Sequence, residues 1–260
     1  MNGFEYLLGM LLAQPVRARD ALRARLPTTR RLRALASSPR VEALRAAERE
    51  RIRRLVEGLA AVEGVTHLLT RVADHCDRPA SLGLLTTTAE GRGVLVCRMS
   101  AAAYFATGED ITAVLPRIEA AGLADWGFPN TWGDEPPYSP GTVAYALRYH
   151  RDRGLFPDGR RMPGPSLSTA DATLVWDLPG IPRPDPYWPR PGSDVYFRHE
   201  QIPADGDPAA LLRAARAEGR GPVLVLTFGR NWTDTCTYHA VPRGRGHRHG
   251  RGRGRGCELG

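Results

Sequence analysis

The hydrophobic residues of this chain change their spacing along its length, and this change constrains the fold more than any other feature. Within the first 80 residues they recur every three or four positions, as on one face of a helix. The clearest helix is expected to begin at Ser38-Pro39, a capping residue followed by a proline that fits the first turn, and to end near Gly64. A further helix is expected at about 66–74, so this whole region is predicted to be helical.

After residue 80, short apolar runs bounded by glycine and proline replace the helical pattern. Such runs are typical of strands. Helices should lie between the strands, because residues typical of helix N-caps occur there. These are Asp110, Ser139-Pro140 and Asp207-Pro208. The order of helices first, then mixed strands and helices, predicts an α+β fold with a mainly antiparallel sheet. The strands are expected at 82–88, 94–99, 172–178, 193–199, 222–228 and 235–241, with the first two and the last two forming hairpins.

We therefore divide the chain into a helical N-terminal region (1–80), a mixed α+β body (81–241) and a basic tail (242–260). The tail alternates arginine with glycine and cannot bury an apolar core, so we expect it to be disordered. Two interpretations stay open for it. It either binds phosphates through its charge, or it is a non-functional extension.

The charge of the chain is carried by arginine and is concentrated at both ends. All 36 basic residues are arginine, for which a GC-rich coding sequence, as in a GC-rich bacterium, is the plain explanation. Of the formal net charge of +8, residues 1–58 carry +7 and the tail carries +5, whereas the segment between them carries −4. Basic ends favour an anionic partner such as nucleic acid. The residues expected to contact such a polyanion are Arg45, Arg49, Arg53, Arg54, Arg243 and Arg245.

The sequence favours a cytoplasmic location and no membrane partner. The first residues lack the basic segment and cleavage site of a secretory leader, and no run of 18 apolar residues is present. Four cysteines in 260 residues are too few for a disulfide framework, so reduced cysteines are expected.

Cys97 and His239 are the candidate catalytic pair. Cys97 lies in the predicted strand 94–99, just before a helix that Ser100 is expected to cap, and the positive N-terminal end of that helix would favour a thiolate. His239 cannot use Cys236, because residues three apart in a strand point to opposite faces. With Asp234 to orient the imidazole, the pair would support acyl transfer through a thioester. This hypothesis describes a thiol-dependent hydrolase or acyltransferase that acts on a small molecule.

Part of the segment 209–241 resembles papain-like cysteine peptidases. Gly221-Pro222-Val223 is similar to a Gly-Pro-Val strand of that family, and His239-Ala240-Val241 is similar to its His-Ala-Val strand. The resemblance implies that His239 is a general base. The family's Cys-Gly-Ser-Cys-Trp motif is missing from this chain, and we assign no family on this basis.

Aromatic residues gather in the irregular segments. Trp126, Trp132, Tyr138 and Trp232 are expected either to line a ligand pocket or to hold long loops against the body. Cysteine and histidine also occur near one another in His75-Cys76, but no Cys-x-x-Cys pair is present, so we expect neither a metal nor another cofactor.

Three functions follow from these patterns. The first is a small-molecule or acyl-group enzyme with the Cys97/His239 site, and the second is a non-enzymatic binder of a polyanion. The third is an accessory or scaffold protein. The sequence favours no particular oligomeric state.

Overall fold

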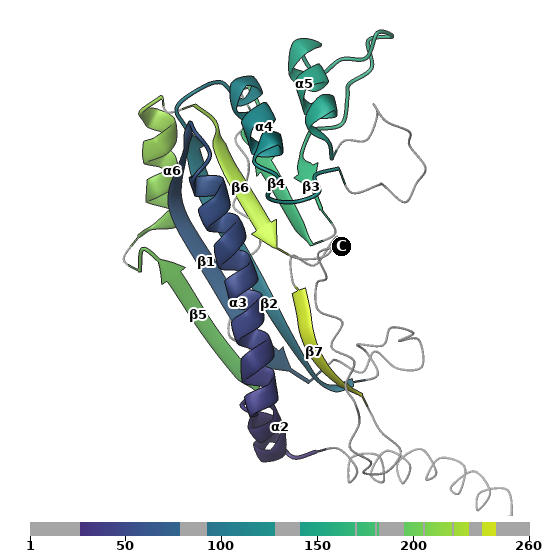
Figure 1. Cartoon of the computed structure of the whole chain (residues 1–260), viewed down its shortest axis with the longest axis vertical. Helices are drawn as coiled ribbons and strands as arrows, with labels where there is room; N and C mark the ends of the chain where they lie inside the picture. Colours follow the sequence, from purple (N-terminus) through teal and green to yellow (C-terminus); the bar gives the residue numbers. More distant parts are fainter. Residues whose placement is uncertain are drawn as a thin grey trace, which may run out of the picture.

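A computed structural model of the chain describes residues 27–78, 93–127, 141–169, 171–179, 181, 195–204, 206–219, 221–228 and 236–242 (Figure 1). It confirms the predicted α+β class with N-terminal helices ahead of a mainly antiparallel sheet. The elements are α2 (Thr29–Ala36), α3 (Pro39–Ala60), β1 (Val65–Asp77), β2 (Gly93–Thr107), α4 (Ile111–Ala120), α5 (Val143–Arg151), β3 (Leu167–Ser168), β4 (Ala172–Trp176), β5 (Tyr196–Ile202), α6 (Pro208–Ala217), β6 (Val223–Phe228) and β7 (Cys236–Pro242).

The long strand β2 organises the sheet. Its strand order is β3-β4-β6-β2-β1-β5, and β7 also pairs with β2. β1 lies antiparallel along nearly the whole of β2, from the pair Val65–Thr107 to the pair Asp77–Val96. The opposite side of β2 is shared by two shorter strands, because β6 pairs with residues 101–106 and β7 with residues 93–99.

The two faces of the sheet are covered unequally. Helices α3, α4 and α5 pack on one face and form the main core with alternate residues of β2, among them Cys97, Met99 and Phe105. The intervening residues of β2, among them Tyr104, pack with α6 on the other face. Figure 1 shows α3 running along β1 and β2, with β5 at the border of the sheet beside it.

Local capping explains where most helices begin. Asp110 and Asp207 accept hydrogen bonds from the first free backbone N–H groups of α4 and α6, as their sequence positions predict. Pro39 occupies the first turn of α3, also as predicted. The expected start of α5 at Ser139-Pro140 lies outside the described residues, and the observed cap is Thr142.

Several predicted elements are wrong. The segment 66–74 is part of strand β1 and not a helix, because its backbone pairs with β2 and β5 on its two sides. Ser100 caps no helix, since β2 continues to Thr107. The last two strands do not form a hairpin; β6 and β7 each pair with β2 instead. The strands expected at 172–178, 193–199 and 222–228 correspond to β4, β5 and β6, whereas 82–88 and the tail after residue 242 lie outside the described residues.

Gly221 gives a test of how tightly β2 and β6 are joined. Its φ is +76°, and a Cβ atom built there would lie 2.6 Å from Thr107 Oγ1 and 2.8 Å from two carbonyl oxygens. Gly219 has a similar φ of +64° but open space around it. We therefore expect G221A to lower the free energy of unfolding clearly more than G219A, which should cost only about 1–2 kcal/mol for its left-handed backbone. Urea denaturation of both variants measures this, and equal losses would contradict the close packing described.

Candidate functional site

A disulfide and a buried ion pair meet beneath helix α3. Cys76 and Cys97 are opposite each other on β1 and β2, and their sulfur atoms are bonded. Both side chains are completely buried. The bond spans 21 positions of sequence, and in a chain-entropy account a loop of this size stabilises the fold by about 3 kcal/mol. The expectation that the cysteines are reduced is therefore wrong for this pair.

The guanidinium of Arg45 is the centre of the cluster. Its side chain is 2% exposed and forms ion pairs with Asp74, which is fully buried on β1, and with Glu42 one turn earlier on α3. Arg45 Nη2 also donates to the carbonyl oxygen of Ala36 at 3.1 Å, and its guanidinium carbon lies 4.1 Å from the ring centre of Tyr196. One side chain thus connects α2, α3, β1 and β5.

Tyr238 completes the network from β7. Its hydroxyl donates to Asp74 Oδ1 at 2.7 Å and lies 3.8 Å from Cys76 Sγ. Burial raises the pKa of Asp74 above its usual range, although Tyr238 and Arg45 oppose this shift. Burial and the nearby Asp74 carboxylate also raise the pKa of Tyr238, so its hydroxyl stays a hydrogen-bond donor. The pKa of Arg45 is raised by Glu42 and Asp74 against the cost of its burial, so the guanidinium stays charged.

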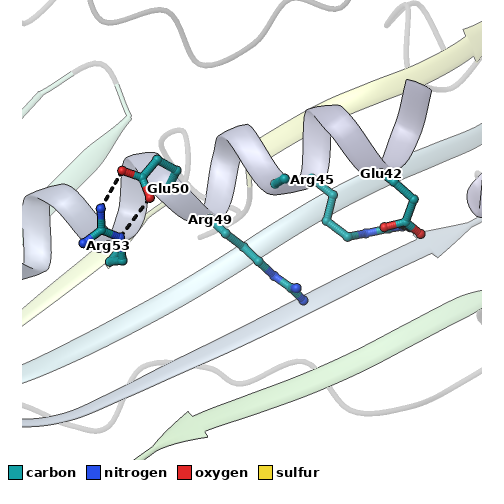
Figure 2. A pocket seen from close by; sticks show the side chains of 6 residues that line it. Glu42, Arg45, Arg49, Glu50 and Arg53 are labelled. Atoms are coloured by element: carbon teal, nitrogen blue, oxygen red, sulfur yellow. Dashed lines mark hydrogen bonds and ion pairs between the residues drawn. The ribbon is translucent and has the colours of Figure 1, made fainter. Parts of the chain in front are cut away.

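A groove of about 280 Å³ lies along the exposed side of this cluster. Its lining residues follow one face of α3, and Figure 2 shows Arg49 extending away from the helix over the sheet. These residues are Glu42, Arg45, Ala46, Arg49, Glu50 and Arg53. At one end of the groove Arg53 is held by Glu50 through two hydrogen bonds of 2.6 and 2.8 Å.

Arg49 has the longest ion-pair contact of the arginines that line the groove. Its Nη2 lies 3.8 Å from Asp74 Oδ2, a carboxylate that Arg45 and Tyr238 already engage. The Nε atom of Arg49 is buried and has no hydrogen-bond acceptor within the described part of the chain. The side chain is 26% exposed, so part of it reaches the groove opening. A buried donor without an acceptor is costly, so Arg49 is poorly satisfied inside the fold, while the exposed part of its side chain is open to an anionic group in the groove.

The structure brings Cys97 and His239 together but leaves Cys97 no thiol. The two residues are direct partners across β2 and β7. The Cys97 sulfur belongs to the disulfide, so the predicted role of nucleophile has no group to perform it in this structure. His239 is 8% exposed, and both burial and the charge of Arg40 lower its pKa. Asp234 lies outside the described residues.

Most of the other predicted site residues lie outside the described part of the chain. Of the aromatic residues expected at a pocket, only Trp126 is described, and it packs beside the main core; Trp132, Tyr138 and Trp232 lie outside the described residues. Arg243 and Arg245 lie outside them as well.

Acidic partners engage the arginines predicted to form a polyanion-binding face on α3. Arg45 is buried against Asp74, so it cannot meet a large external ligand. Arg53 pairs with Glu50 and Glu57, and Arg54 lies 3.7 Å from Glu50. Arg45 and Arg49 both keep buried donors without a hydrogen-bond acceptor among the described residues. Those of Arg45 lie in its ion pairs with Glu42 and Asp74, whereas Arg49 only approaches Asp74, at 3.8 Å.

Sequence reasoning missed Asp74, Cys76, Tyr196 and Tyr238 as members of one cluster. These residues lie on three strands, and only strand register makes them neighbours. One signal was present, because Asp74 directly follows the apolar pair Val72-Ala73, and a carboxylate buried beside such residues requires a partner.

Comparison of the chain with protein-family models, with curated proteins and with solved structures found no match. No helix in the described part of the chain is both long and apolar enough to cross a membrane. Within the same residues, no group of three or more histidine, cysteine, aspartate or glutamate side chains is arranged to hold a metal ion. The site must therefore be interpreted from its own geometry.

The hydrogen bond from Tyr238 to Asp74 can be tested against a neutral counterpart. Y238F removes a buried donor to a carboxylate and should lower the free energy of unfolding by about 1.5–3 kcal/mol. Y145F removes a donor to the carbonyl oxygen of Pro163 at 2.8 Å, in an equally buried residue, and should cost about 0.5–1.5 kcal/mol. Chemical denaturation at neutral pH compares the two, and an equal or smaller loss for Y238F would show that Asp74 does not depend on this donor.

Proposed function

We propose that this protein is a non-enzymatic accessory protein that binds an anionic group of its partner in the groove beside α3. The observation that carries the proposal is Arg49, whose buried Nε has no acceptor in the described residues and whose nearest carboxylate is shared with Arg45 and Tyr238. A carboxylate or a phosphate accepts two hydrogen bonds from one guanidinium, so either group fits this position.

The surroundings of Arg49 favour one compact anionic group over a long polyanion. Glu42 and Glu50 flank the groove and would repel a ligand with evenly spaced negative charges. The exposed arginines next to the groove are already paired with glutamates. The binding of nucleic acid along the α3 face, an alternative that the sequence raises, would require these ion pairs to open.

The thiol-enzyme alternative is the weaker proposal. It requires a free Cys97, and the sulfur of Cys97 is bonded to Cys76 in the completely buried core. His239 lies opposite Cys97 in the strand register, but a disulfide offers no thiolate for an acyl transfer. The core beneath α3 is held by ion pairs and by the disulfide. These features favour a binding surface over a reactive centre.

Substitution of Arg49 tests the binding proposal. Titration calorimetry with inorganic phosphate and with citrate should give affinities that R49Q weakens about tenfold or more, because a hydrogen bond to a charged group contributes about 1.5–3 kcal/mol. R54Q is the matched control. It removes the same charge from a residue that is 67% exposed and lies outside the groove lining, so it should change these affinities less than about twofold.

A duplex oligonucleotide separates the compact-anion proposal from polyanion binding. Salt-sensitive binding of the duplex, weakened equally by R49Q and R54Q, would indicate a general basic surface and would contradict a site centred on Arg49. The absence of phosphate and citrate binding by the unmodified protein would also reject the proposal.

We also propose that the protein works in an oxidising compartment. A cytoplasmic location, which the sequence favours, conflicts with the Cys76–Cys97 bond, because cytosolic thiols are kept reduced. The bond lies between strands in the middle of the sheet, where it fixes the register of β1 on β2.

Alkylation of the purified protein tests this second proposal. Protein that has been kept free of reductant and then unfolded in a maleimide reagent should retain unlabelled Cys76 and Cys97, and both should label after reduction. Peptide mass analysis identifies the two sites. Stoichiometric labelling of either residue without reductant, in protein taken from its native compartment, would support the cytoplasmic location instead.

A further inference from the structure

Strand β5 lies at the border of the sheet. It pairs with β1 over residues 196–202, and no described strand pairs with its other side. Figure 1 shows β5 beside β1 at the outer limit of the sheet. The backbone N–H and C=O groups along such an edge can pair with another strand. Seven residues are enough for a substantial ladder.

Register assigns the side chains of β5 to the two faces of the sheet. Tyr196 lies opposite Cys76 and packs against Arg45 beneath α3, so it points to the helix-covered face. Because side chains alternate along a strand, Arg198, Glu200 and Ile202 point to that same face. Ile202 is 56% exposed, which is unusual for a large apolar residue in a strand.

The sequence of β5 is complementary to itself in one antiparallel register. When two copies pair about a two-fold axis at His199, Arg198 of each copy lies opposite Glu200 of the other. In the same register, Tyr196 of each copy lies opposite Ile202 of the other. The pairing therefore creates two cross-strand ion pairs and two apolar contacts on one face.

Neighbouring registers lack this complementarity. A two-fold antiparallel pair must place one residue on the axis, so a shift moves that position along the strand. With Arg198 on the axis, two arginines lie opposite each other, and with Glu200 on the axis, two glutamates do. Like charges directly opposite in a sheet are unfavourable. The charge order of the strand thus disfavours the two neighbouring registers, and the register centred on His199 pairs the opposite charges.

We propose that β5 is a dimerisation strand, and that its partner is β5 of a second copy of this chain. The contact is isologous, because the same residues serve both copies. It extends the sheet across the two-fold axis and leaves the α3 helices of both copies on the same face. Burial and the charge of Arg71 lower the pKa of His199, which reduces the charge repulsion between the two imidazoles at the axis.

The same charges explain why this edge would not pair with unrelated strands. Arg198 and Glu200 interrupt the apolar character of β5, and charged residues on an edge protect it from general aggregation. An unrelated apolar strand would leave both charges unpaired at the contact, whereas a second copy pairs them. Specific self-association is therefore compatible with the protected edge.

Charge reversal tests the proposal in the full chain. Sedimentation velocity at micromolar concentrations should show a monomer–dimer equilibrium for the unmodified protein. R198E places two glutamate pairs at the contact and should raise the dimer dissociation constant by more than about tenfold, and E200R should do the same with two arginine pairs. The double variant R198E/E200R restores opposite charges across the axis and should recover the dimer.

Several outcomes would overturn the proposal. They are a monomer at every concentration, a dimer that R198E leaves unchanged, or a double variant that dissociates as easily as the single ones.

Hydrogen exchange gives an independent measurement that needs no variant. Amides of residues 196–202 should exchange more slowly as the protein concentration rises, whereas those of β4 should not change. Concentration-independent exchange along β5 in a protein that sediments as a dimer would place the contact elsewhere.

Discussion

The buried ion pair between Arg45 and Asp74 is the interaction on which the described structure most depends. Two charges removed from water are stable only when their remaining hydrogen-bonding groups are satisfied. Glu42, the Ala36 carbonyl and the Tyr238 hydroxyl supply these partners, each from a different part of the chain. Loss of one partner of a buried pair typically costs about 3–5 kcal/mol, because the other charge is left alone. The network therefore fixes how α3 lies on the sheet.

The disulfide and the ion pair act on the same region in different ways. The Cys76–Cys97 disulfide cross-links β1 to β2 and restricts the conformations of the unfolded chain. Arg45 instead acts in the folded state, where it connects α2, α3, β1 and β5. Arg45 Nη2 lies 3.8 Å from Cys76 Sγ, so the two meet at one point. A groove above such a rigid base presents Arg49 in a fixed place, as the binding proposal requires.

Local sequence signals predicted the elements that depend on neighbouring residues. The caps at Asp110 and Asp207 were predictable because capping involves residues two or three positions apart. Strand β1 was not predictable in the same way. Its apolar residues also fit a helix, and the choice is made by pairing with β2 and β5. The cluster of Arg45, Asp74 and Tyr238 depends on that pairing, so it could not be derived from spacing along the chain.

The exclusive use of arginine has a structural consequence at this site. The planar guanidinium of Arg45 reaches a carboxylate on the sheet, a second carboxylate on its own helix, a backbone carbonyl and an aromatic face. A lysine ammonium is a compact, strongly hydrated charge with three donors, and it would be costlier to bury among these groups. Composition alone suggested that the arginines form an anion-binding surface. In the structure, however, the buried Arg45 stabilises the fold. In the binding proposal the ligand meets Arg49, because the Asp74 carboxylate that Arg49 approaches is already engaged by Arg45 and Tyr238.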